Sequence, residues 1–154
     1  MIKEVDKNGL KQALALVNNV FSEFVAVDYT EQGKKSFADY LKTKYDEMSS
    51  DIETEHKKLW GYYQDDEIIG VIATRDISHI ALMFVDKHHH RKGIARKLLD
   101  NVLAEINGNV DITEMTVNSS PYAVKFYERL GFVKTDEQQE KNGIIYIPMA
   151  RRLG

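Results

Sequence analysis

The hydrophobic pattern of the chain changes period between residues 79 and 106. The run HIALMFV at 79–85 is rich in residues that favour β-strands. The apolar positions that follow it fall four apart, which is a helical spacing, at Ile94, Leu98, Val102 and Ile106. A strand therefore runs into a helix, and Gly108 stands where a helix commonly ends. This unit restricts the chain to folds that combine a sheet with helices.

The residues before this unit predict further strands and helices. A short strand is expected at 1–5, followed by a helix with apolar positions at Leu10, Leu14, Val17 and Phe21. A second helix should begin behind the N-cap residue Thr30, with apolar positions at Phe37, Tyr40, Leu41, Tyr45 and Met48. β-rich runs at 59–63, 68–74 and 79–85 predict an antiparallel meander.

The residues after the unit predict another strand, a short helix and a hairpin. The strand is expected at 112–118, and the helix in SSPYAVKFYERLGF should be capped by Ser119 or Ser120, with Pro121 in its first turn. Strand, helix and strand in succession imply that 79–85 and 112–118 pair in parallel. The predicted class is α+β: a mixed, largely antiparallel sheet with a central parallel pair and about four helices, in one domain over residues 1–154.

Composition excludes several classes of protein. The chain has no cysteine, so disulfides, thiolate metal sites and cysteine nucleophiles are ruled out. Its first residues, MIKEVDKNGL, lack the apolar core of a signal peptide, and no apolar run approaches the roughly 18 residues of a membrane span. A cytoplasmic protein without membrane contact is expected. The net charge is −3, with an acidic excess concentrated between residues 28 and 67.

The turn between the strand and the helix has the chemistry of a phosphate site. The first N–H groups of a helix have no partner within the helix, and the helix dipole is positive at that end. Gly93 and Ala95 are small enough for a ligand to approach the backbone closely. Four basic residues, Arg91, Lys92, Arg96 and Lys97, add positive charge. The turn therefore predicts a pyrophosphate cradle.

Other readings of this segment fit less well. HHHRKGIA lacks the first glycine and the Ser or Thr of a P-loop, and it lacks two glycines of a dinucleotide fingerprint. Three consecutive histidines in a turn point in different directions, so no metal site is expected. One short basic cluster on an acidic chain does not make a nucleic-acid surface. A helix that merely begins with basic residues remains an alternative.

A second motif argues against that alternative. HRKGIARKLL, followed at the distance of one helix and one strand by VNSSPYAVKFYERLGF, resembles the GNAT superfamily of acyl-CoA-dependent N-acetyltransferases. Gly93 and Ala95 fall on the small positions of the family pattern, whereas His90 stands where the family has Gln or Arg. The resemblance covers most of the chain and specifies residues 20–60 least.

The resemblance implies how acetyl-CoA binds. The strand at 79–85 should splay from the strand at 112–118, and the pantetheine arm should lie in the gap, paired with the backbone of Met83, Phe84 and Val85. The pyrophosphate should meet the turn and helix start at His90, Arg91, Lys92, Gly93, Ile94, Ala95 and Arg96. Asn118 should hydrogen-bond the arm. No metal cofactor is implied.

The resemblance also implies direct acetyl transfer to an acceptor amine. Tyr127 is similar to the general acid of the family, which protonates the departing thiolate; from spacing alone it would be a core aromatic beside Phe126 and Leu130. The base is either His79, Glu114 or a water molecule, and both side chains also fit an exposed surface.

The sequence leaves three questions open. The chain could be a non-catalytic acyl-CoA-binding regulatory module on the same scaffold, or a structural protein without a ligand, and Tyr127 and Asn118 favour the enzyme. A homodimer is neither required nor excluded. In the family the early helices shape the acceptor site, and here that region carries the acidic segment YDEMSSDIETE. We therefore expect the acceptor to be a small cationic amine.

Overall fold

The computed structural model describes residues 1–20, 30–39, 57–89, 92–141 and 143–153. Its helices are α1 (Lys7–Val20), a helix at 31–39, α3 (Ile94–Ile106) and α4 (Val124–Arg129), with short 3-10 helices η3 (Lys87–His89) and η4 (Pro121–Ala123). Its strands are β1 (Ile2–Glu4), β2 (Lys57–Gln64), β3 (Glu67–Arg75), β4 (His79–Val85), β5 (Glu114–Ser119), β6 (Val133–Lys134), β7 (Gln139–Lys141) and β8 (Ile144–Arg152). No helix among these residues is long and apolar enough to cross a membrane.

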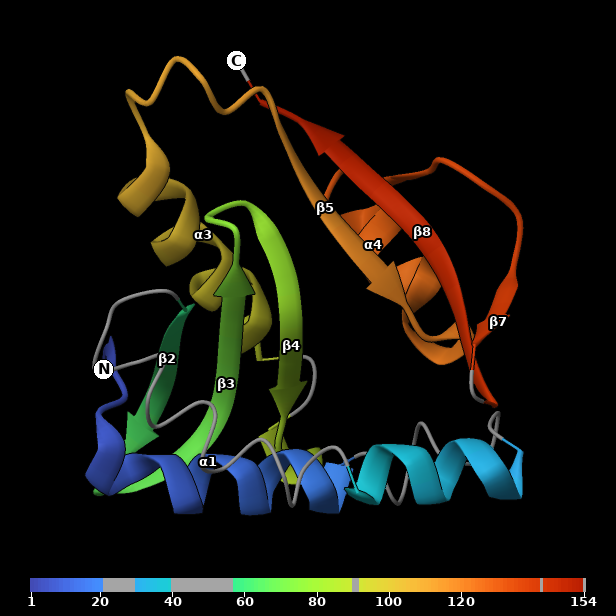
Figure 1. Cartoon of the computed structure of the whole chain (residues 1–154). Helices are drawn as coiled ribbons and strands as arrows, with labels where there is room; N and C mark the ends of the chain where they lie inside the picture. The colour runs from blue at the N-terminus through green and yellow to red at the C-terminus, as the bar shows by residue number, and fades with distance from the viewer. Residues whose placement is uncertain (21–29, 40–56, 90–91, 142, 154) are drawn as a thin grey trace.

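The strands form one mixed sheet in the order β1-β2-β3-β4-β5-β8-β6, with β7 paired to β8 (Figure 1). Every pairing is antiparallel except the one between β4 and β5. That parallel pairing holds only at His79 with Thr116 and at Ile80 with Val117. Figure 1 shows the consequence, because β4 and β5 diverge from their joined end towards α1 and helix 31–39.

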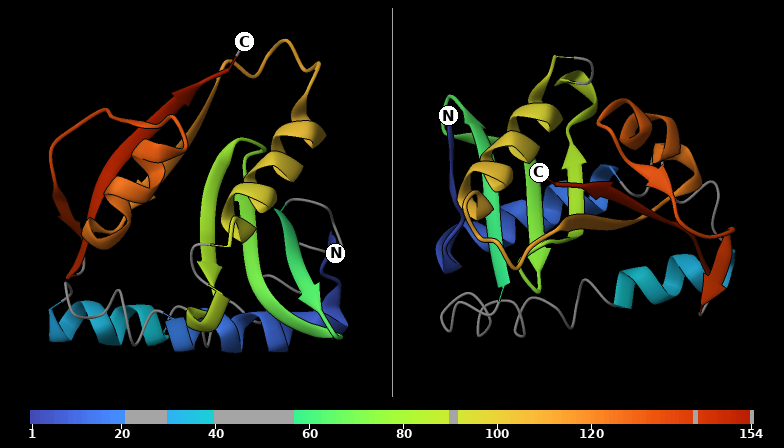
Figure 2. Two further views of the ribbon diagram at one scale, coloured as in Figure 1. Left: turned by 180° about the vertical axis from the view of Figure 1, so that it is seen from behind. Right: turned by 90° about the horizontal axis from the view of Figure 1, so that it is seen from above.

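The sheet carries a separate hydrophobic core on each face. On one face α3 and α4 pack over Ile72, Ile80, Met115 and Met149, and the view from behind shows both helices in front of the strands (Figure 2). On the other face α1 packs over Val71, Ala73 and Leu82. Residues 68–74 of β3 are buried without interruption, because this central strand is covered on both sides.

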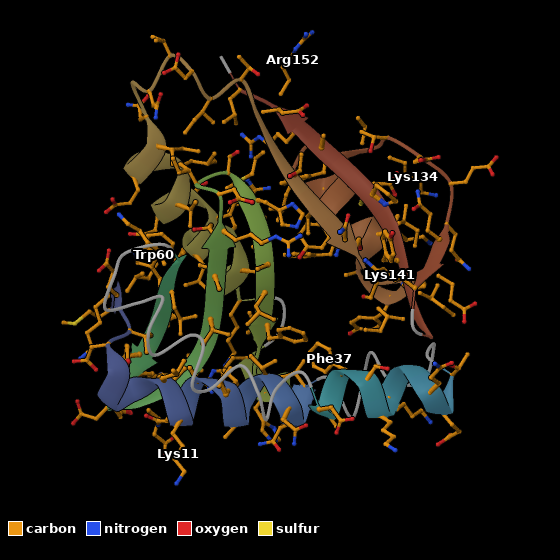
Figure 3. The ribbon with its side chains drawn as sticks, viewed as in Figure 1. Lys11, Phe37, Trp60, Lys134, Lys141 and Arg152 are labelled. Atoms are coloured by element: carbon orange, nitrogen blue, oxygen red, sulfur yellow. The ribbon has the colours of Figure 1, made fainter. Side chains whose placement is uncertain are left out.

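Helix 31–39 is tied to the far end of the sheet. The Thr30 hydroxyl accepts a hydrogen bond from the Gly33 amide at 3.0 Å, which is the N-cap expected from the sequence, and donates one to the Gly143 carbonyl at 3.3 Å. Phe37 points from this helix towards the sheet and packs against the α1 core, whereas Lys11 of α1 points away from it (Figure 3). The helix therefore connects the α1 core to the turn between β7 and β8.

The predicted order of elements is confirmed, and three details are corrected. The predicted strand at 112–118 is shorter at its start and runs from Glu114 to Ser119, because the Ile112 amide bonds the Asn109 carbonyl in a turn. The Ser120 side chain makes no capping bond, and the Ser119 hydroxyl donates to the Ser120 carbonyl instead. The segment first forms η4 at Pro121 before α4 begins. Phe21, Tyr40, Leu41, Tyr45 and Met48 lie outside the described residues.

Candidate functional site

A β-bulge in β4 changes the face of the sheet on which the following side chains lie, close to the point where β4 separates from β5. Ala73 pairs with Leu82 but Thr74 pairs with Ile80, so Ala81 is an extra residue on β4. Side chains two apart normally share a face, yet Ile80 is buried in the α3 core and Leu82 in the α1 core. After Ile80, β4 has no further pair with β5 among the described residues. Met83, Phe84 and Val85, the predicted cofactor-pairing residues, lie on this separated part of β4 and are partly buried.

The helix that follows β4 begins with an open turn. Gly93 is the N-cap of α3 with φ +76, a left-handed conformation that most residues avoid, and beyond its chain neighbours no atom of the described residues lies within 4 Å of where a Cβ would stand. Glycine has no side chain to cap the first amides of the helix as Ser, Thr or Asp would, so Gly93 leaves these amides to other acceptors. Ile94 is buried and anchors the first turn, Ala95 is partly buried, and Lys92 is exposed. His90 and Arg91 lie outside the described residues.

Gly70 positions this helix and was not anticipated from the sequence. A Cβ at Gly70 would lie 3.0 Å from the Ile94 side chain and 3.2 Å from that of Leu98, so the first turn of α3 packs directly on the backbone of β3. The same glycine pairs with Val85, the last residue of β4. A glycine in the middle of a strand is the signal that could have revealed this close approach.

Two of the basic side chains near this turn are engaged elsewhere. The Arg96 guanidinium donates to the Arg129 carbonyl at 3.2 Å, at the end of α4. The Lys97 ammonium lies 5.8 Å from the centre of the Tyr62 ring on β2. The predicted contact of Arg96 with pyrophosphate therefore concerns its backbone amide, and Lys92 is the described lysine exposed at the turn itself.

One face of β5 carries the remaining polar candidates. Buried Met115, Val117 and Ser119 alternate with Glu114, Thr116 and Asn118, which share the opposite face. Asn118 is exposed and follows the last residue that pairs with β4, so it lies where the strands have separated. Glu114 is exposed at the joined end, in register with Arg152 of β8.

His79 lies at the joined end of the two strands. Its ring Nδ1 is 2.7 Å from the Thr116 Oγ1, and it faces away from its buried neighbour Ile80. Burial, together with the nearby Arg75 guanidinium, lowers the pKa of His79 below its usual 6.5, although Asp76 opposes the shift. The imidazole is therefore neutral at pH 7. If Nδ1 carries the proton and donates to Thr116, Nε2 is free to accept one.

Tyr127 lies on the opposite face, inside the α3 and α4 core. Its side chain is 5% exposed, and its ring makes edge contacts with Phe126 at 5.2 Å and Phe132 at 5.5 Å between centroids. Burial raises the pKa of the Tyr127 hydroxyl well above its usual 10. The phenol stays protonated, as a general acid requires, and the burial also matches the structural alternative of a core aromatic.

The sequence YERLGF ends α4 in a Schellman motif. The Phe132 amide donates to the Tyr127 carbonyl and the Gly131 amide to the Glu128 carbonyl, both at 3.0 Å, while Gly131 has φ +92. The contact between the Tyr127 and Phe132 rings is the hydrophobic contact that accompanies such motifs. The glycine and phenylalanine of the second sequence motif thus fix the backbone and ring of Tyr127.

A separate surface hollow of about 600 Å³ lies against the outer side of α4. Acidic and basic side chains are mixed around it, namely Lys125, Glu128, Lys134, Asp136 and Glu137, and it contains none of the predicted site residues. We place the candidate site at the separated strands instead, because Met83, Phe84, Val85 and Asn118 lie on the parts of β4 and β5 that have separated. Among the described residues, no group of three or more His, Cys, Asp or Glu side chains could hold a metal ion.

The chain matches the acetyltransferase (GNAT) domain family over residues 25–153. A curated relative, the UPF0157 protein YqkA of Bacillus subtilis (strain 168), is 29% identical over 102 residues, which are 64% of this chain and 30% of that protein. The chain therefore matches less than a third of the length of this relative.

Solved structures share the fold. A GCN5-related N-acetyltransferase from Rhodopseudomonas palustris has a TM-score of 0.80 at 17% identity, covering 99% of this chain and 95% of that one. The PaiA N-acetyltransferase of Thermoplasma acidophilum, solved in complex with coenzyme A, has a TM-score of 0.79 at 17% identity, covering 99% and 98%. An acetyltransferase of GNAT family from Staphylococcus aureus Mu50 has a TM-score of 0.77 at 16% identity, covering 100% and 99%. With the family match over residues 25–153, the separated β4 and β5, and the open turn at Gly93, the chain belongs to the GNAT acetyltransferase family.

Proposed function

We propose that the protein transfers an acetyl group from acetyl-CoA directly to the amino group of a small cationic acceptor. The observation that carries this proposal is the early separation of β4 from β5, which pair at only two positions, followed after β4 and η3 by the first turn of α3 with glycine as its N-cap. This arrangement offers backbone groups to the pantetheine arm and helix amides to the pyrophosphate. The coenzyme A complex of the similar Thermoplasma protein supports the same ligand class.

Proton transfer is assigned to residues on the two faces of the sheet. The acceptor nitrogen attacks the thioester carbonyl carbon, the carbon–sulfur bond then breaks, and the departing sulfur takes a proton from the Tyr127 hydroxyl. The proton lost by the amine passes to His79 Nε2, or to water leading to His79 or Glu114. In this proposal the thioester lies between the separated strands, with Tyr127 on the α4 side of the sheet and His79 on the other side, next to the end where the strands join.

The acceptor assignment rests on charge. The acidic segment at 45–55 favours a cationic substrate, and it lies outside the described residues. Amines that carry a second positive charge should therefore have higher kcat/KM than neutral amines of the same size. Equal kcat/KM for amines with and without a second positive charge would refute the assignment. Protein N-termini and lysine side chains would then become the next acceptors to test.

The direct test is incubation with acetyl-CoA and a panel of amines, with free thiol measured over time. The panel contains diamines, monoamines of matched length, and lysine peptides. Amine-dependent thiol release, with the acetylated product seen by mass spectrometry, is the expected result. Binding of coenzyme A by calorimetry without thiol release from any amine would instead indicate the acyl-CoA-binding regulatory module. Absence of both binding and release would reject either role.

A further inference from the structure

The end of α4 presents two backbone carbonyls that the helix itself leaves unpaired. The Schellman motif occupies the Tyr127 and Glu128 carbonyls, and the Leu130 amide donates to the carbonyls of Phe126 and Tyr127. The carbonyls of Arg129 and Leu130 come next, at the negative end of the helix dipole. Orphan carbonyls at a helix end require donors from outside the helix.

Two arginines from distant elements supply those donors. Arg96, in the first turn of α3, donates to the Arg129 carbonyl at 3.2 Å. Arg151, on β8, donates to the Leu130 carbonyl at 3.0 Å from a partly buried position. A Cβ on Gly131 would lie 3.5 Å from the Arg151 side chain, so this arginine also lies along the turn that ends α4. Hydrogen bonds from charged donors are roughly twice as strong as neutral ones. The bond from Arg96 is exposed to solvent, so the partly buried bond from Arg151 is the stronger of the two.

These bonds fix a helix that could not hold its position alone. α4 has six residues, and isolated helices of this length are unstable in water. Its place is set by the packing of Tyr127 and Leu130 in the core, by the Schellman motif and by the two guanidinium groups. Tyr127 and Arg129 are only two residues apart, so a shift of the helix end moves the Tyr127 hydroxyl as well.

We propose that Arg96 and Arg151 are positioning residues that hold the end of α4 and thereby place the Tyr127 hydroxyl against the leaving sulfur. This inference rests on the proposed function of Tyr127 as general acid. It assigns the Arg96 side chain to α4 rather than to phosphate, and it gives Arg151, outside both sequence motifs, a role in the reaction.

A double-mutant cycle tests the proposal at saturating acetyl-CoA. Arg151→Gln removes the guanidinium, and misplacement of a reacting group by about 1 Å can lower the rate roughly 10²-fold. We expect kcat to fall by about tenfold to a hundredfold, with the affinity for coenzyme A unchanged. In a Tyr127→Phe background the same change should have no further effect on kcat, because no hydroxyl remains to be placed. Additive losses, or an unchanged kcat in Arg151→Gln, would overturn the proposal.

Arg96→Gln provides a second variant, should Arg151→Gln fail to fold. The substrate S-acetylpantetheine, which lacks the phosphates, separates the two possible roles of Arg96. A positioning role lowers kcat by the same factor with S-acetylpantetheine and with acetyl-CoA. A phosphate role would weaken acetyl-CoA binding and leave S-acetylpantetheine turnover unchanged, which would refute the assignment. Lys125→Gln removes one positive charge from α4 without touching its terminal carbonyls and is the matched control.

A measurement that needs no turnover keeps this inference distinct from the proposed function. In protein labelled with ¹³Cζ-tyrosine, the Tyr127 signal is identified by its loss in Tyr127→Phe. It should shift or broaden in Arg151→Gln and stay unchanged in Lys125→Gln. An unshifted signal would reject the positioning role. A parent protein without acetyl transfer would reject the proposed function while the signal still reports whether the arginines place the ring.

Discussion

At the residue scale, Tyr127 has both the burial of a core aromatic and the hydroxyl proton of a proposed general acid, which are usually treated as alternatives. It is as buried as a core aromatic, and its neighbours Phe126 and Phe132 hold its ring at defined angles. That burial raises the pKa of the hydroxyl and keeps its proton in place. A core position therefore does not remove the proton that a general acid must donate, although the same desolvation makes this hydroxyl a weaker acid than that of a free tyrosine.

Tyr127→Phe separates these two contributions. The ring and its packing are retained while the proton donor is removed, so the melting temperature and coenzyme A affinity should change little. Positioned acid catalysis is worth roughly 10²- to 10⁴-fold, and we expect kcat to fall within that range. The measurement is steady-state turnover, with a pre-steady-state experiment to show that chemistry limits the rate. Turnover within about twofold of the parent would exclude the general-acid role.

His79 predicts a pH dependence with a definite sign. The pKa of His79 is lowered in the folded state, so between that pKa and 6.5 the unfolded chain binds a proton that the folded chain does not. The contribution of His79 to stability is therefore complete above pH 6.5 and is lost as the pH falls towards the folded pKa. If His79 is also the base, the acid limb of kcat/KM should lie below pH 6.5.

His79→Asn is the variant for this test, because the Asn amide can still bond Thr116 from the Nδ1 position. Thermal melts from pH 7.5 to pH 5 should show a smaller loss of melting temperature than in the parent. The acid limb of kcat/KM should disappear. An identical acid limb in parent and variant would assign the base to Glu114 or water.

Gly93 can be tested with a pair of isosteric substitutions. Asn and Asp both tolerate left-handed backbone better than other residues with a Cβ, and the described residues leave space beside Gly93, so both variants should fold. Gly93→Asp places a negative charge where pyrophosphate is expected, whereas Gly93→Asn adds similar bulk without charge. Calorimetry should show a much larger loss of coenzyme A affinity for Asp than for Asn. Equal affinities would place the pyrophosphate elsewhere.

At the element scale, the ends of two helices adopt the same backbone for different purposes. Gly108 follows α3 with φ +86, and Gly131 follows α4 with φ +92. Only the second belongs to a Schellman motif that fixes Tyr127. α4 is short, so it depends on its terminal motif and on packing against the core for its position.

Gly131→Ala and Gly108→Ala form a matched pair. Each forces a residue with a Cβ into left-handed backbone, at roughly 1–2 kcal/mol, and neither new Cβ meets a contact shorter than 3.5 Å. Chemical denaturation should show similar losses of stability for both variants. Only Gly131→Ala should also lower kcat, because it disturbs the turn that holds Tyr127. A similar kcat for the two variants would mean that the α4 terminus does not affect the reaction.

At the scale of the whole molecule, the sheet consists of two parts that share few backbone bonds. β1 to β4 with α1 form one part, and β5 to β8 with α4 form the other (Figure 1). Among the described residues, the two parts are joined by two residue pairs between β4 and β5, by the core shared by α3 and α4, and by the contact of Thr30 with Gly143. That contact is tight, because a Cβ on Gly33 would overlap the Gly143 carbonyl.

Thr30→Val should weaken this connection. Valine keeps the shape of the side chain but loses the bonds to the Gly33 amide and the Gly143 carbonyl. Loss of an N-cap costs about 1 kcal/mol and each further hydrogen bond roughly 1 kcal/mol, so the free energy of unfolding should fall by about 1–2 kcal/mol. Thr30→Ser keeps the hydroxyl and should lie close to the parent. Equal stability of the two variants would show that the contact contributes nothing.

The sequence by itself determined the local structure and the family pattern. The change of period located β4 and α3, Gly93 marked the helix start, and Thr30 marked the cap of helix 31–39. These features depend on residues within a few positions of one another, so periodicity and residue type are sufficient to predict them. The two sequence motifs likewise predicted the family before any contact was known.

Only the tertiary structure decided how the site is assembled. The bulge at Ala81 moves Leu82 to the other face, Gly70 admits α3, Arg96 bonds α4, and Thr30 meets a glycine 113 residues away. Each of these depends on register and on packing between distant segments. Many strand pairings and registers are compatible with the same local hydrophobic pattern. The chain adopts the one that buries both hydrophobic cores.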